Sequence, residues 1–135
     1  MTIIESIVQF LNQYEKEKIG VDKLGSSTMS YSLMKEPQEN VHRFISGLEV
    51  HTDYYQLAAR RDAASEADRI ANNAWGQGIA EWISQREQAG EYPALDGYVC
   101  TGIGISTPFY FGASDNGSAV YQVTIKIEYR KEKSR

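Results

Sequence analysis

The sequence has little cysteine, little proline and no long hydrophobic run. Its 135 residues include one cysteine, Cys100, and three prolines. A single cysteine cannot form an internal disulfide, and it does not make a cysteine metal cluster. No apolar stretch approaches the roughly 20 residues that cross a bilayer. The early apolar pairs Ile3-Ile4 and Ile7-Val8 are interrupted by Glu5-Ser6, unlike the core of a signal peptide. We therefore expect a soluble, intracellular chain with no membrane partner.

The sequence also lacks an excess of positive charge. Lysine and arginine number 14 against 18 acidic residues, which gives a net charge of −4. Proteins that bind nucleic acid through its phosphates normally carry a basic face. Here the basic residues are scattered, apart from Arg60-Arg61 and the tail at 130–135. We expect this tail to be a frayed terminus, and we expect no sequence-specific nucleic-acid partner.

What is present is typical of one folded domain that covers residues 1–135. Hydrophobic residues make up 41% and charged residues 24%, which is the balance of a globular protein. Apolar residues recur at three- and four-residue steps over 2–18 and 65–89, and this period predicts two amphipathic helices. Thr2 and Ser65 each precede an acidic residue by three positions, as in a capping box.

The second predicted helix is followed by one glycine and contains two more in its interior. Gly90 follows the last apolar residue of the pattern and is expected to end the helix in a left-handed conformation. Gly76 and Gly78 each cost roughly 1 kcal/mol relative to alanine inside a helix. We interpret both as points where the helix approaches a sheet closely.

Alternating apolar residues predict the strands. The segment 27–35 alternates and is broken at 36–40 by Pro37 and its polar neighbours. The segment 41–61 is β-rich, and its apolar parity changes near Tyr54-Tyr55, which predicts a bulge or a bend there. Alternatively, 42–46 is a short separate piece ended by Gly47. Two more strands follow, at about 99–105 and 119–130, joined by turn residues at 114–118.

The predicted order of elements is α-β-β-α-β-β. Two amphipathic helices and an amphipathic sheet must bury their apolar faces on one another. Pairs of strands on either side of the long helix favour antiparallel pairing. The predicted fold class is therefore α+β, a two-layer sandwich with a mainly antiparallel sheet packed against two helices.

No catalytic motif is present. Glu49, His51 and Asp53 would share one face of a strand and carry N and O ligands for a divalent ion, but a solvated polar face is the favoured interpretation. Gly102-Ile103-Gly104 lacks the third glycine and the following helix of a dinucleotide site. Cys100 is expected to be a buried apolar thiol. We predict no catalytic residue, no cofactor and no metal.

Acidic residues near the start of the second helix need no catalytic explanation either. Asp62, Glu66 and Asp68 could be taken for paired acids, but a helix N-terminus attracts acidic side chains through its dipole.

The run Phe109-Tyr110-Phe111 is the strongest sign of an interaction surface. Three adjacent aromatics cannot all enter one face of a core, and aromatics are enriched at interfaces. We expect 107–118 to be a docking loop with a flexible tip, although a bulged strand end that covers its own core would also account for the aromatics. Arg60 and Arg61 are either interface charges or a solvated face. The candidate interface residues are Arg60, Arg61, Phe109, Tyr110, Phe111, Asp115 and Asn116.

Several landmarks together resemble the small minor-capsid or tail-terminator proteins of tailed phages and prophages of Gram-positive bacteria. Their order and spacing carry the resemblance, which extends over most of the chain. They are the N-terminal helix, Arg43-Phe44-Ile45-Ser46-Gly47, the strand 55–61, Ile70-Ala71-Asn72-Asn73, Glu81-Trp82-Ile83, Tyr92-Pro93-Ala94-Leu95 and Ala119-Val120-Tyr121-Gln122-Val123.

The resemblance implies a virion component without catalysis, made in the bacterial host cytoplasm. Proteins of this kind form a homo-oligomeric ring, of six subunits, at the head-proximal end of the tail tube. The ring stops tube polymerisation and joins the head connector, so the implied partners are the tail tube protein and the head connector or stopper protein. Two alternatives remain open: another head–tail connector or minor capsid protein, and a small-molecule enzyme or binding module with a deep pocket.

Overall fold

The computed structural model describes residues 1–27, 29–115 and 117–131. This part of the chain forms two helices and five strands, and it confirms the α+β class and the mainly antiparallel sheet. The elements are α1 (Ile3–Leu11), β1 (Ile19–Val21), β2 (Ser30–Arg43), β3 (Glu49–Asp62), α2 (Glu66–Ala89), β4 (Tyr98–Asp115) and β5 (Ser118–Lys131). The short strand β1 was not predicted.

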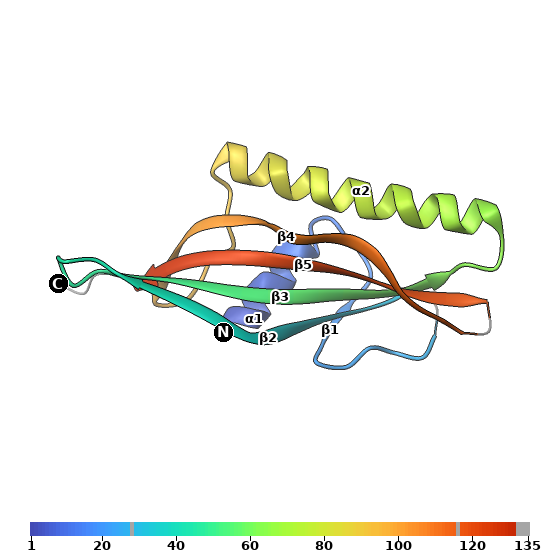
Figure 1. Cartoon of the computed structure of the whole chain (residues 1–135), viewed down its shortest axis with the longest axis horizontal. Coiled ribbons are helices and arrows are strands. Elements are labelled where there is room, and N and C mark those ends of the chain that lie inside the picture. The colour runs from blue at the N-terminus through green and yellow to red at the C-terminus, as the bar shows by residue number, and fades with distance from the viewer. Residues whose placement is uncertain (28, 116, 132–135) are drawn as a thin grey trace.

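The strands lie in the order β1-β2-β3-β5-β4 (Figure 1). Strand β1 pairs with β2 in parallel, and the other three pairings are antiparallel. Helix α2 connects β3 to β4, and the last strand, β5, lies between these two. Figure 1 shows an elongated molecule in which the β2–β3 and β4–β5 hairpins extend toward opposite ends.

Both predicted capping boxes are confirmed. The backbone amide of Glu5 donates to Thr2 Oγ1, and the amide of Asp68 donates to Ser65 Oγ at 3.1 Å. Gly90 ends α2 with φ +70°, as expected for a left-handed cap. Helix α1, however, ends at Leu11 rather than near residue 18. The side-chain amide of Asn12 donates through Nδ2 to the carbonyls of Glu15 and Glu17, which holds the chain in a turn just after α1.

Strand β2 is longer than the sequence predicted, because Pro37 does not break it. The β2–β3 register shifts between Lys35 and Glu39, so 36–38 form a bulge. Strand β1 pairs with β2 only at 31–33, so β2 is an edge strand at Pro37, where a missing amide is tolerated. The irregularity predicted near Tyr54-Tyr55 is present in the β2–β3 pairing, because the register shifts opposite Tyr54. The extra residues lie in β2, however, and not in β3, which pairs with β5 without interruption from Val50 to Asp62.

The two faces of the sheet differ. Alternate residues of β2, β3 and β5 point toward the helices and form the core with α1 and α2. The alternation predicted for the last strand is confirmed, since its inward side chains are all buried. Those side chains are Ala119, Tyr121, Val123, Ile125, Ile127 and Tyr129. In the described part of the chain, the opposite face of the sheet carries no helix.

Two glycines of α2 lie where the sequence analysis expected close approach. A Cβ at Gly76 would overlap the ring of Phe109 on β4, and a Cβ at Gly78 would overlap the hydroxyl of Tyr14. The neighbour of Gly76 is thus a strand, as predicted, whereas that of Gly78 is the segment after α1. Over the described residues, neither helix has the length and apolar character needed to cross a membrane.

Candidate interaction surfaces

Arg60 and Arg61 are adjacent in β3 and therefore point to opposite faces of the sheet. On the helix-free face, Arg60 Nε donates to the carbonyl of Gly25 at 3.0 Å. On the helix-covered face, Arg61 donates to Asn72 Oδ1 at 2.7 Å and to the Tyr31 hydroxyl at 2.6 Å. The two residues do not form one charged surface, and each holds a segment of its own chain.

Arg61 belongs to a polar network that joins four elements. Its guanidinium lies 5.3 Å from the centre of the Trp75 ring in α2. Asn72, which is buried, also donates to the carbonyl of Asp62 and to the Tyr121 hydroxyl of β5. Burial is the main cause that raises the pKa of Tyr31 to about 12, and the nearby Arg61 opposes the rise. The geometry gives Arg61 a packing role inside the subunit.

The segment expected to be a docking loop is a strand. Strand β4 continues to Asp115 and pairs with β5 along this length, with register shifts around residues 107 and 110 and again between Phe111 and Ala113. The prediction of a loop was wrong because the shifts let three adjacent aromatics take different directions without leaving the sheet. Asn116 lies outside the described residues, as do 132–135 of the predicted frayed tail, and the structure does not describe the Asp115 side chain.

The three aromatics of β4 have different surroundings. Phe109 stacks on Tyr121 with ring centres 4.9 Å apart and lies against Trp75 of α2, so it packs between helix and sheet. Phe111 meets the edge of Tyr121 but is 57% exposed. Tyr110 is exposed on the opposite face and is bonded through its hydroxyl to Gln122 Oε1. Tyr110 and Phe111 therefore remain candidates for contact with a partner, whereas Phe109 is an internal contact.

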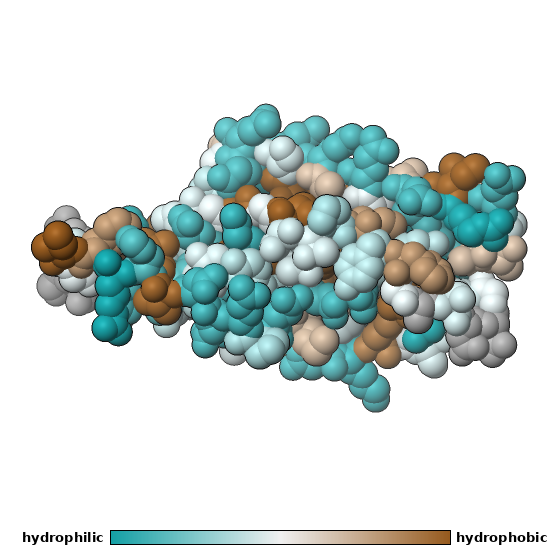
Figure 2. All heavy atoms as spheres, viewed as in Figure 1, coloured by the Kyte–Doolittle hydropathy of each residue, from teal (hydrophilic) through white to brown (hydrophobic). Residues whose placement is uncertain are grey.

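An apolar tip that the sequence analysis did not select lies at the other end of the molecule. The β2–β3 hairpin turns at 44–48, where the amide of Gly47 donates to the carbonyl of Phe44 and Gly47 has φ +90°. Phe44 is about half exposed and Ile45 is fully exposed. Figure 2 shows hydrophobic atoms at this end of the molecule, on the left. Two apolar residues directly before a Ser-Gly turn were the sequence signal for this tip.

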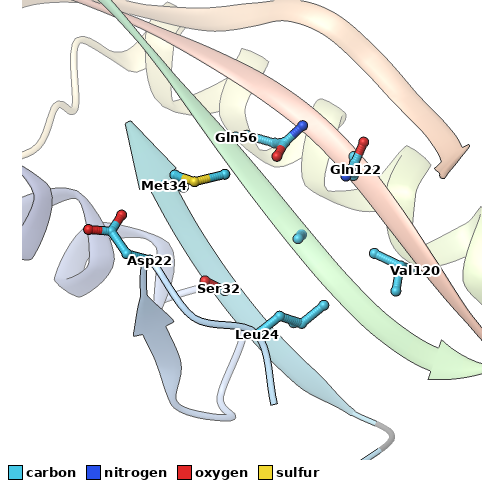
Figure 3. Close-up of a pocket in the computed structure, with 8 residues that line it drawn as sticks. Asp22, Leu24, Ser32, Met34, Gln56, Val120 and Gln122 are labelled. Atoms are coloured by element: carbon cyan, nitrogen blue, oxygen red, sulfur yellow. The ribbon is translucent and has the colours of Figure 1, made fainter. Parts of the chain in front are cut away.

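A shallow hollow of about 200 Å³ lies on the helix-free face (Figure 3). Met34, Gln56 and Gln122 project into this region from three neighbouring strands, and Leu24 lies over β2. Its wall mixes amide, hydroxyl and apolar groups. We assign no ligand to it.

A more apolar groove runs between α2 and β4, the edge strand. It has a volume of about 340 Å³, and Figure 2 shows hydrophobic atoms below α2 in this region. The amide of Ile103 faces this edge and donates to Glu87 Oε2 at 2.8 Å, so the helix shields part of the edge strand. The groove is lined by Ala80, Ile83, Ser84, Glu87, Ile103, Gly104 and Ile105.

Of the three residues considered for metal binding, His51 and Glu49 contact each other, and Asp53 is bonded to Tyr129. His51 Nε2 lies 3.6 Å from Glu49 Oε2, and its ring stacks on Tyr129. Asp53 is 1% exposed and accepts a hydrogen bond from the Tyr129 hydroxyl at 2.8 Å. Burial is the main cause that raises the pKa of Tyr129, and the Asp53 carboxylate adds to it. Within residues 1–27, 29–115 and 117–131, no group of three such side chains is arranged to hold a metal ion.

Cys100 is a buried thiol, as expected. Its Sγ lies 3.5 Å from the carbonyl of Gly102. Burial raises the pKa of this thiol to about 11. A thiol with a raised pKa is a poor nucleophile at neutral pH because little thiolate is present.

The comparisons with known proteins give no further indication of the surfaces' role. No protein-family model matches the chain, and no curated protein sequence matches it either.

Proposed function

We propose that the chain is a non-catalytic structural protein of a phage or prophage virion, of the tail-terminator type. In this role it forms a homo-oligomeric ring of six subunits at the head-proximal end of the tail tube and stops the tube from growing. It also contacts the head connector or stopper protein. It is made in the host cytoplasm and acts in the virion. The proposal extends the sequence resemblance described above.

One observation supports the proposal most strongly: exposed apolar side chains lie at opposite ends of one elongated sheet. Phe44 and Ile45 lie in the β2–β3 turn at one end, and Tyr110 and Phe111 lie in β4 toward the β4–β5 end. A subunit of a closed ring needs two different patches that meet head to tail, together with surfaces for the partners above and below. Adjacent exposed apolar side chains, such as Phe44 and Ile45 at the hairpin turn, favour an assembly role because contiguous apolar patches mark interaction sites.

The observed strand pairing also suits a rigid subunit of a ring. The β3–β5 pairing joins the two long hairpins through thirteen consecutive residue pairs, from Val50–Arg130 to Asp62–Ser118. A continuous sheet of this kind holds the two hairpins rigidly relative to each other, because no hinge lies between them. The alternative, another head–tail connector protein, would use the same surfaces with a different partner. The experiment below distinguishes it from a tail terminator.

Tail length in a lysogen whose prophage encodes this chain tests the proposal. We expect deletion of the gene to give overlong tail tubes without heads, and complementation with the intact gene to restore tails of uniform length, both scored by electron microscopy. Tails of normal length that fail to join heads would instead favour the connector alternative. Normal virions from the deletion strain would contradict both roles.

A further inference from the structure

The β2–β3 tip and the α2–β4 groove are two apolar features of one chain that cannot meet within a subunit. The tip is the far end of the hairpin formed by β2 and β3. The groove lies at β4, the opposite edge of the sheet, with β5 between β4 and β3. Both strands of the hairpin are hydrogen-bonded into the sheet, so the tip has a fixed direction away from the groove (Figure 1).

We propose that the tip of one subunit inserts into the α2–β4 groove of the next copy of the chain. Ile45 is the central inserted side chain, and Phe44 packs beside it. The two patches are different, so the contact is heterologous and closes into a ring when the rotation between subunits permits. This inference rests on the ring-forming role proposed above, and it names the interface by which that ring assembles.

The size and chemistry of the groove favour this occupant. Its volume of about 340 Å³ is many times the roughly 30 Å³ that a water molecule occupies in the liquid, so it admits a branched aliphatic side chain. Ile83, Ile103 and Ile105 give it an apolar lining. The hollow on the helix-free face is a poorer acceptor because Asp22, Gln56 and Gln122 contribute polar groups to its wall.

Charge at the margins of the two features is also complementary. Arg43, directly before Phe44, is 77% exposed although it pairs with Glu49. The carboxylate of Glu87 lies at the groove and belongs to a helix that carries Glu66, Asp68, Glu81 and Glu87 against Arg69 and Arg86. Such opposed charges at a rim steer the approach of the partner and fix its orientation.

Disulfide cross-linking tests the contact directly. We compare the double variant Ile45→Cys/Ser84→Cys with the control Ile45→Cys/Ala71→Cys, whose second cysteine is also at an exposed position of α2 but lies outside the groove. A disulfide forms only where two Cα atoms come within about 7 Å. Cys100 adds little background because it is buried.

The expected result is a ladder of covalent oligomers for the 45–84 pair under mild oxidation, at least tenfold above the 45–71 control. Ile45→Asp is expected to lower the association constant at least tenfold in sedimentation experiments without changing the melting temperature, because Ile45 is fully exposed. Met34→Asp, at an exposed apolar site on the helix-free face, is expected to leave association unchanged.

Equal cross-linking of the two pairs would overturn the inference, as would unchanged assembly of Ile45→Asp. A wild-type chain that stays monomeric and gives no 45–84 product would overturn it too. Tail length separates this failure from that of the proposed function. If Ile45→Asp complements the deletion while an empty vector does not, the terminator role stands and this interface is wrong. Normal virions from the deletion strain would contradict the terminator role, and the cross-linking result would then report only whether the chain associates through this contact.

Discussion

The contact between Gly76 and Phe109 provides a sharp test of how α2 sits on the sheet. A Cβ at position 76 would overlap the Phe109 ring, which is held between Trp75 and Tyr121 and has little freedom to move. Overpacking of a well-packed site costs about 1–3 kcal/mol, and we expect the upper end here. Replacing a helical glycine with alanine returns about 1 kcal/mol. The net expectation for Gly76→Ala is a loss of about 2 kcal/mol in the free energy of unfolding.

The sign of the effect should reverse when the ring is removed. In a Phe109→Ala background the three atoms nearest to the added Cβ are gone, so Gly76→Ala should stabilise the protein by about 1 kcal/mol through the helix propensity of alanine. The two substitutions are then coupled by about 3 kcal/mol, a large value that is expected only for residues in direct contact. Gly104→Ala serves as the matched control because no atom lies within 4 Å of its added Cβ.

Urea unfolding of the wild type, the two single variants and the double variant measures the effect. The comparison requires that the slope of the unfolding free energy against urea concentration is the same for all four. A stabilising Gly76→Ala in the native background would refute the reasoning. It would mean that Phe109 is free to leave the space under α2, as the docking-loop interpretation required.

Four further outcomes follow from the structure. Trp82→Ala should lower the free energy of unfolding by about 3 kcal/mol. This is the lower end of the range for a tryptophan because the ring is half-buried against Phe10 of α1. An unchanged unfolding midpoint would contradict this contact. Cys100 should react with a thiol reagent at pH 8 only after unfolding, because burial raises its pKa to about 11; rapid labelling of the folded protein would contradict this. The free energy of unfolding should fall as the pH rises from about 9 to 12. Burial raises the pKa of Cys100 and Tyr31 in the folded state, so these groups ionise first in the unfolded chain. A stability that does not change with pH over this range, followed by circular dichroism, would exclude this linkage. Addition of a chelator should leave the melting temperature unchanged, whereas a drop of several degrees would indicate a structural ion.

Local patterns predicted the elements that depend on local chemistry. The caps at Thr2, Ser65 and Gly90 are interactions between near neighbours, so the sequence contains all their information. The alternation of β5 was equally clear, because this strand is central and has one face buried along its whole length.

The errors arose where a long-range partner decides the structure. Pro37 is compatible with a strand only because its position is an unpaired edge, which no local pattern reveals. Arg61 was taken for a surface charge, yet Asn72 and Tyr31 receive its hydrogen bonds from distant segments. Phe109 was assigned to a loop because the sequence does not show that α2 leaves a space for it at Gly76. The exposed apolar tip at Phe44 and Ile45 was missed for the opposite reason, since apolar residues are normally assigned to the interior.

The position of β5 has a consequence for how the chain folds during synthesis. Strand β5 follows β4 in the chain but lies between β3 and β4 in the sheet, so β5 must leave the ribosome before these two strands gain their common neighbour. Until then the inward side chains of β3 and β4 lack the apolar surface that Val123, Ile125 and Ile127 supply. A chain truncated before residue 118 would expose two unpaired strand edges and be prone to aggregation. The sheet is therefore completed only after β5 has left the ribosome, and chains that stop before β5 cannot form it.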